Sequence, residues 1–119
     1  MAAHHVPPHR VNGGYAMPAY LIADETITDP DTFEEYKRAV LPLIEQFGGR
    51  FLSRGGALDV LEAGKDWVPG RMVIIEFPDM PALKKWYNSA AYAPVREVRL
   101  RSAKSTLVAL DSGSAVLAG

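Results

Sequence analysis

The feature that most constrains this chain is an unbroken apolar run, Met72-Val73-Ile74-Ile75, which lies between Gly70 and Pro78. A run of this length and β-branched content predicts a strand, which we place at residues 71–77. A strand with one face in water normally alternates apolar and polar side chains, and this run does not alternate. Both faces of the strand must therefore be covered by other protein.

The surrounding patterns predict the remaining elements. A helix is expected from Pro30 to the Gly48-Gly49 pair, because Asp29 can cap it and its apolar residues recur at steps of three and four. Residues 58–62 are expected to return along, or to extend, an earlier strand after a turn at Gly55-Gly56. The other expected elements are strands at 19–26, 50–54 and 105–110, a helix after Asp79 and a short helical segment at 94–101.

The order β-α-β-β-α-β predicts an α+β domain of ferredoxin-like architecture, with an antiparallel sheet and its helices on one face. Three strands are nonetheless apolar at consecutive positions, at residues 20–23, 72–75 and 107–110. The simplest cover for the second sheet face is a second copy of the chain across a two-fold axis. The alternative is a monomer that uses this apolar face to capture a ligand.

The chain has 119 residues, a length that favours a single domain, which we place at residues 17–111. Residues 1–16 are interpreted as a disordered leader or extension, and residues 112–119 as a flexible tail. The leader contains all three histidines, His4, His5 and His9, without acidic or thiol partners, so no metal site is predicted there.

Composition excludes several classes of function. The net charge of −1 predicts no binding to nucleic acid or to an anionic membrane surface. No apolar run is long enough for a membrane-spanning helix, so a cytoplasmic protein is expected. With no cysteine in the chain and no histidine after His9, the domain lacks thiolate chemistry, a histidine haem ligand and a Ser-His-Asp triad. We therefore predict no cofactor and no metal.

Three motifs, Gly48–Gly56, Ile74–Pro78 and Trp86–Arg99, together resemble a bacterial family known as domain of unknown function 1330, and the resemblance extends from Met17 to Asp111. This family belongs to the dimeric α/β-barrel superfamily of ferredoxin-like proteins. The resemblance implies a homodimer whose sheets face each other. It implies no established activity, because the superfamily includes cofactor-free monooxygenases, lactone isomerases and haem-dependent enzymes.

Glu76 is the candidate catalytic residue, because it interrupts an otherwise apolar strand and a buried carboxylate needs a partner. Arg54 and Arg71 are the expected partners. A structural ion pair or an exposed strand end is one interpretation. The other is a general base, or an anion-binding pair with Arg54, that faces a pocket.

Trp86, Tyr87 and Tyr92 surround Ser89 at an expected break between helical segments. They are interpreted either as core residues or as the lining of a pocket. Ser89 is expected to cap a helix, since no base accompanies it. The basic residues Arg96, Arg99, Arg101 and Lys104 are expected to form a solvated helix face, and the alternative is that they recruit a phosphate or an acidic substrate.

The sequence therefore predicts a small homodimer that binds a small organic molecule between sheet and helices. The candidate ligand-binding residues are Arg54, Glu76, Trp86, Ser89 and Tyr92. One alternative is a cofactor-independent enzyme, of monooxygenase or isomerase type, with Glu76 as general base. The other is a purely structural dimer.

Overall fold

The computed structural model describes residues 10–11, 14–15 and 17–113. Most of the expected leader and tail, with His4, His5 and His9, lies outside the described residues, so the domain boundaries stay a prediction. Within the leader, a two-residue strand β1 (Arg10–Val11) pairs with β2 (Gly14–Tyr15), a pairing that the sequence did not indicate.

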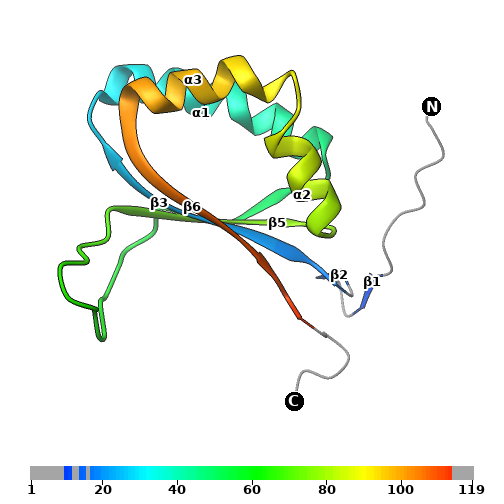
Figure 1. Ribbon diagram of the computed structural model, residues 1–119, viewed down its shortest axis with the longest axis horizontal. Coiled ribbons are helices and arrows are strands. Elements are labelled where there is room, and N and C mark those ends of the chain that lie inside the picture. The colour runs from blue at the N-terminus through cyan, green and yellow to red at the C-terminus, as the bar shows by residue number, and fades with distance from the viewer. Residues whose placement is uncertain (1–9, 12–13, 16, 114–119) are drawn as a thin grey trace.

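Four antiparallel strands in the order β4-β5-β3-β6 form the main sheet, and three helices cover one of its faces (Figure 1). This is the predicted ferredoxin-like architecture. The strands are β3 (Ala19–Ile27), β4 (Arg50–Arg54), β5 (Arg71–Phe77) and β6 (Ala103–Asp111). The helices are α1 (Pro30–Gln46), α2 (Met80–Tyr87) and α3 (Tyr92–Ser102).

Helix α1 forms where capping and periodicity agree. The Asp29 carboxylate accepts hydrogen bonds from the Thr32 backbone N–H at 3.2 Å and from the Thr32 hydroxyl at 2.7 Å. Its buried stripe faces the sheet and consists of Phe33, Tyr36, Val40 and Ile44. The helix is followed by Gly48, whose φ of 83° suits glycine best.

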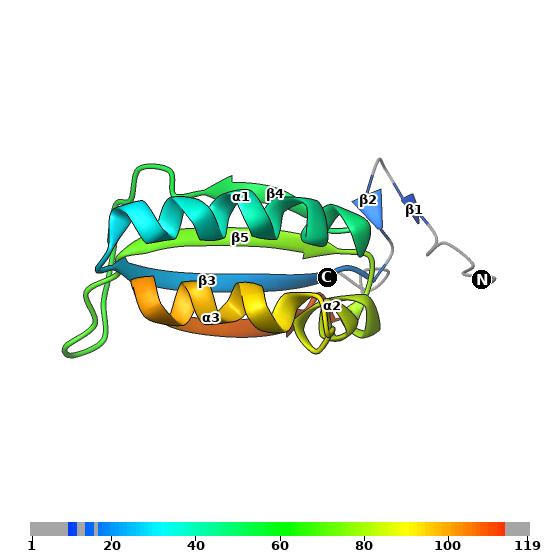
Figure 2. The ribbon, with the colours of Figure 1, turned by 90° about the horizontal axis from the view of Figure 1, so that it is seen from above.

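The second helical part is split in two, as the sequence predicts. Helix α2 begins after Asp79, which accepts a hydrogen bond from the Ala82 backbone N–H at 2.8 Å. Ser89 accepts a hydrogen bond from the Tyr92 backbone N–H at 3.1 Å, so it supports the start of α3. Figure 2 shows α3 beside α1 above the sheet, with α2 near the end of α3.

The expected strand at residues 58–62 is wrong: residues 55–70 form a long loop, in which residues 58–62 are exposed and pair with no described strand. Strand β4 pairs with β5 instead, because Gly55 turns the chain at a φ of 78° and its N–H donates to the Met72 carbonyl at 2.8 Å. Asp24 anchors the end of the loop by accepting hydrogen bonds from Trp67 Nε1 at 3.0 Å and from the Gly70 N–H at 2.8 Å.

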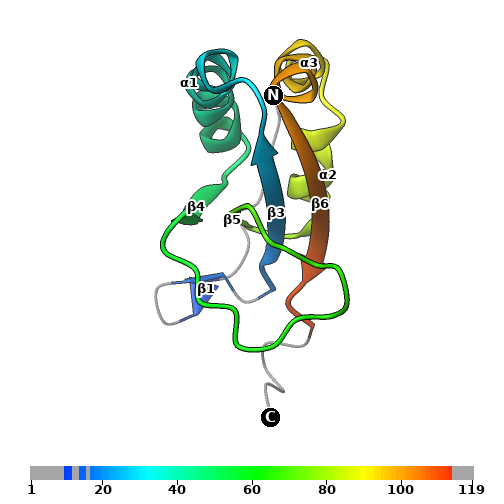
Figure 3. The same cartoon turned by 90° about the vertical axis from the view of Figure 1, so that its left-hand side faces the viewer.

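The register divides the sheet into two different faces, which Figure 3 shows edge-on with the helices on one side. The helix-covered face carries Leu21, Ala23, Val73, Ile75 and Phe77, all of which are buried. We call the opposite side the open face. Its apolar residues are Tyr20, Ile22, Met72, Ile74, Val108 and Leu110, and the last two are each 51 % exposed.

Among the described residues, no helix combines the length and the apolar character that a membrane span requires.

Candidate functional site

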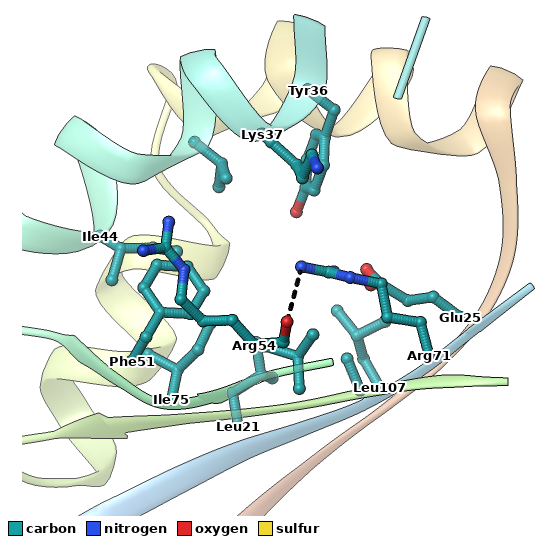
Figure 4. Close-up of a pocket in the computed structure, with 13 residues that line it drawn as sticks. Leu21, Glu25, Tyr36, Lys37, Ile44, Phe51, Arg54, Arg71, Ile75 and Leu107 are labelled. Atoms are coloured by element: carbon teal, nitrogen blue, oxygen red, sulfur yellow. Dashed lines mark hydrogen bonds and ion pairs between the residues drawn. The ribbon is translucent and has the colours of Figure 1, made fainter. Parts of the chain in front are cut away.

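An inner pocket of about 40 Å³ lies between α1 and the helix-covered face of the sheet (Figure 4). Its walls are mostly apolar, but several charged or hydroxyl-bearing side chains line it as well. The pocket residues are Leu21, Ala23, Glu25, Tyr36, Lys37, Val40, Ile44, Phe51, Arg54, Arg71, Val73, Ile75 and Leu107. Apolar walls with a few convergent polar groups are typical of small-molecule sites.

Glu25 and Arg71 form the central ion pair of this pocket. They are opposite each other on β3 and β5, and Arg71 Nη1 donates to Glu25 Oε1 at 2.7 Å. Arg71 Nη2 also reaches the Arg54 carbonyl oxygen at 3.5 Å, the contact dashed in Figure 4. Gly55 lies against the same arginine, because a Cβ atom there would approach Arg71 Nε to 2.8 Å. The Arg71 guanidinium is therefore held from two sides of the pocket.

A second polar group links the helices above the pocket. The hydroxyls of Tyr36 and Tyr92 are hydrogen-bonded at 2.9 Å, and Arg99 Nε approaches the Tyr92 hydroxyl at 3.4 Å. Arg99 is only 4 % exposed, and no described carboxylate forms an ion pair with it. The surroundings of the inner pocket thus include the half-buried Arg71, the buried Arg99 and a neighbouring carboxylate, Glu25.

Burial changes the acidity of two groups in this region. Burial raises the pKa of Glu25 above its ordinary value, and the hydrogen bond and charge of Arg71, with the charge of Arg99, offset only part of this effect. Burial likewise raises the pKa of Tyr36 far above its ordinary value, and the neighbouring Tyr92 hydroxyl adds to the increase. Tyr36 is therefore a neutral hydrogen-bonding group, whereas Glu25 takes up a proton more readily than an exposed carboxylate.

An outer groove of about 370 Å³ adjoins the inner pocket. The two spaces share three lining residues, Lys37, Arg54 and Arg71, and all three are cationic. The Arg54 guanidinium lies 4.5 Å from the centre of the Phe51 ring, at the edge of the apolar wall. Lys37 is ion-paired with Glu34 at 2.6 Å and Arg71 with Glu25 at 2.7 Å, so Arg54 is the one of these three cations that has no ion-paired carboxylate among the described residues. Its charge favours an anion at the entrance to the inner pocket. The remaining groove residues are Glu34, Arg38 and Leu41.

The structure does not bring the two main predicted site residues together. Arg54 lines the pocket, but Glu76 alternates with Ile75 and Phe77 and so belongs to the open side of β5. The partner of Glu76 is neither Arg54 nor Arg71 but Arg50, whose Nε donates to Glu76 Oε1 at 2.7 Å. The register explains this, since Arg50 is opposite Glu76 and Arg54 is opposite Val73.

The other predicted site residues do not line the inner pocket. Trp86 and Tyr92 are fully buried and pack on each other, with ring centres 4.4 Å apart. Ser89 donates to the Trp86 carbonyl at 2.8 Å and accepts from the Tyr92 N–H, but the N-cap residue of α3 is Ala91, not the predicted Ser89. Of these residues, only Tyr92 is connected to the pocket, through its hydrogen bond to Tyr36.

Sequence reasoning missed Glu25 and Tyr36 as site residues, and the expectation of a solvated Arg99 is wrong. Glu25 could have been found, because it continues the two-residue alternation of Leu21 and Ala23 that places side chains on one face. The sequence did not indicate that Arg99 is buried, because a run of basic residues on a helix normally faces water.

Within the part of the chain that the structure describes, no three acidic, histidine or cysteine side chains are grouped so that they could hold a metal ion.

RPA0582 and SnoaB are among the proteins of known structure that share this fold. A protein of unknown function from Rhodopseudomonas palustris, RPA0582, has 18 % identity and a TM-score of 0.67, over 80 % of this chain and 82 % of its own. SnoaB, a cofactor-independent oxygenase from Streptomyces nogalater, has 13 % identity and a TM-score of 0.55, over 80 % of this chain and 92 % of its own. Likeness at this level of identity shows the fold alone.

A comparison with curated proteins finds no match. The sequence profile of the family described as "Domain of unknown function (DUF1330)" matches residues 18–112, which is most of the chain. Together with the ferredoxin-like fold, this match confirms the resemblance drawn from the three motifs: the chain belongs to the DUF1330 family.

Proposed function

We propose that this protein binds a small organic acid where the outer groove meets the inner pocket. The observation that carries the proposal is the cationic junction of Lys37, Arg54 and Arg71, which opens onto apolar walls. A carboxylate can pair with a guanidinium in this position, and its organic part can then replace water against Phe51 and Ile75.

The charge balance of the interior also favours an anion. Glu25 neutralises only one of the two arginines, and Arg99 has no ion-paired carboxylate among the described residues. A buried positive charge without a partner is costly, so an incoming anion would offset part of that cost. A neutral ligand of the same shape would lack this contribution.

The proposal is tested by calorimetric titration with octanoate and with 1-octanol, two probes that differ mainly in their head groups. We expect measurable binding of octanoate, at least about tenfold weaker binding of the alcohol, and loss of this preference in Arg54→Gln. Arg101→Gln is the matched control, because Arg101 is exposed on α3 and does not line the pocket. Equal binding of the two probes by the wild-type protein would contradict the proposal.

A second candidate function is proton transfer without a cofactor, and Glu25 takes the role that the sequence suggested for Glu76. It is supported by the position of Glu25 on the pocket wall and by its raised pKa, since a carboxylate with a raised pKa is a stronger proton acceptor than an exposed one. SnoaB shares the fold and is a cofactor-independent oxygenase, which makes this chemistry worth testing.

The test follows exchange of the C3 protons of 2-oxooctanoate in deuterium oxide by nuclear magnetic resonance. Acceleration by the wild-type protein that disappears in Glu25→Gln would support this candidate. Glu76→Gln is the matched control, because Glu76 is a buried carboxylate on the other face. No acceleration, or equal loss in both variants, would remove the enzymatic candidate and leave binding alone.

We further propose that the open face pairs with a second copy of the chain, as the family resemblance implies. Its support is the row of half-buried or exposed apolar residues that includes Ile22, Ile74 and Val108. Light scattering should give the mass of a dimer for the wild-type protein and the mass of a monomer for Val108→Lys. Leu100→Lys, a substitution of similar exposure on α3, should leave the dimer intact. A dimer that binds neither octanoate nor 2-oxooctanoate would favour a purely structural role.

A further inference from the structure

A second pocket of about 400 Å³ lies beneath α2, against β3 and β6. Two of its lining residues, Leu21 and Leu107, also line the inner pocket. The two pockets are therefore neighbours, since both lie against the same pair of leucines. The full set of residues around the second pocket is Leu21, Leu83, Lys84, Tyr87, Asn88, Leu107 and Ala109.

Three spaces thus follow one another across the helix-covered face of the sheet. The outer groove shares Lys37, Arg54 and Arg71 with the inner pocket, and the inner pocket shares two leucines with the pocket under α2. Their volumes are about 370, 40 and 400 Å³ in that order. The inner pocket is the smallest of the three spaces, and it shares lining residues with both of the wider ones.

We infer that the ligand is a straight-chain aliphatic carboxylate, an inference that rests on the organic-acid binding proposed above. The carboxylate lies at the cationic junction, and the alkyl chain passes through the inner pocket, beyond Leu21 and Leu107, to the pocket under α2. The inner pocket has space for only a few water molecules, which suits a single methylene chain and excludes a fused ring system.

This arrangement predicts how affinity depends on chain length. Each methylene buried against apolar walls strengthens binding roughly fourfold. We therefore expect affinity to rise steadily from butanoate to decanoate as the chain advances past the leucines. Naphthoate, whose rings are too wide for the inner pocket, should bind more weakly than decanoate.

The experiment is calorimetric titration of the full chain with straight-chain carboxylates from butanoate to dodecanoate, each below its micelle concentration. Ala109→Trp is the main variant, because Ala109 lines the pocket under α2 and is exposed, so a larger side chain fills that pocket without disturbing the core. Asn88→Trp is an independent second variant on the opposite wall. Ala39→Trp, at an exposed position on α1 that lines none of the three spaces, is the control.

In Ala109→Trp we expect decanoate to lose about sixteenfold in affinity, the contribution of roughly two buried methylenes, and butanoate to change less than about twofold. Ala39→Trp should bind both acids as the wild type does. An affinity that does not depend on chain length, or an equal loss for butanoate and decanoate in both pocket variants, would overturn this inference while leaving organic-acid binding in place. If no acid of the series bound, both proposals would fail.

Discussion

Glu25 and Glu76 are both 5 % exposed, and each accepts a hydrogen bond of 2.7 Å from an arginine, but they lie on opposite faces of the sheet. Their surroundings differ. The side chain of Arg50, which holds Glu76, is 55 % exposed, whereas that of Arg71, which holds Glu25, is 24 % exposed. Glu25 also lines a pocket and lies near a second buried guanidinium. Burial of a carboxylate therefore does not by itself identify a candidate binding site. Glu25 is distinguished from Glu76 by the pocket beside it and by the second guanidinium nearby.

The largest expected effect compares the two glutamates directly. Glu25→Ala should lower the free energy of unfolding by about 3 kcal/mol, because it leaves the half-buried guanidinium of Arg71 without its ion-pair partner. Glu76→Ala should cost only about 1 kcal/mol, since Arg50 can return to water. Urea denaturation of both variants measures the difference. Equal losses of stability in the two variants would contradict the expected difference between the two ion pairs.

A smaller effect is expected at the hydroxyl pair above the pocket. Tyr92→Phe should lower the free energy of unfolding by about 1.5 kcal/mol, because both Tyr36 and Arg99 lose a hydrogen-bond partner. Tyr36→Phe should cost about 1 kcal/mol, since only Tyr92 loses a partner and it still accepts from Arg99. The same denaturation measurement tests the order, and a larger loss in Tyr36→Phe would contradict it.

The pH dependence of stability sharpens the comparison further. Because the pKa of Glu25 is raised on folding, the native state binds more protons than the unfolded state above the ordinary value of 4.5. The contribution that protonated Glu25 makes to the free energy of unfolding is therefore complete below pH 4.5. It is lost as the pH rises through the raised pKa that Glu25 has in the folded state. Wild-type stability should fall relative to Glu25→Gln across this range in urea denaturation. A relative gain would mean that the charge of Arg71 outweighs burial.

The smallest expected effect concerns Arg54. It is exposed and forms no ion pair among the described residues, so Arg54→Gln should change the free energy of unfolding by less than about 0.5 kcal/mol. The same variant should lose octanoate preference, which separates binding from folding at the pocket entrance. A loss of stability well above that of Arg101→Gln in thermal unfolding would assign Arg54 a structural role instead.

The fold was accessible to sequence reasoning because its signals are local. The cap at Asp29, the stripe of Phe33 and Tyr36, and the apolar run at Met72 each act within a few residues. The one wrong strand, residues 58–62, lies in an exposed loop, where local pattern without a neighbouring strand does not make a sheet.

The site depended on contacts between distant residues. Glu25 and Arg71 are far apart in the chain, and they meet only because β3 and β5 pair in one particular register. A bulge between Phe51 and Ser53 likewise places Arg54 opposite Val73, on the helix-covered face, where an unshifted register would place it opposite Met72 on the open face.

The chain alone therefore specified the order of elements, the helix caps and the family, because these depend on neighbouring residues. Tertiary structure decided which carboxylate faces a pocket, that Arg99 is buried and that Lys37, Arg54 and Arg71 converge. Strand register and helix packing set those relations, and neither is encoded in any single segment.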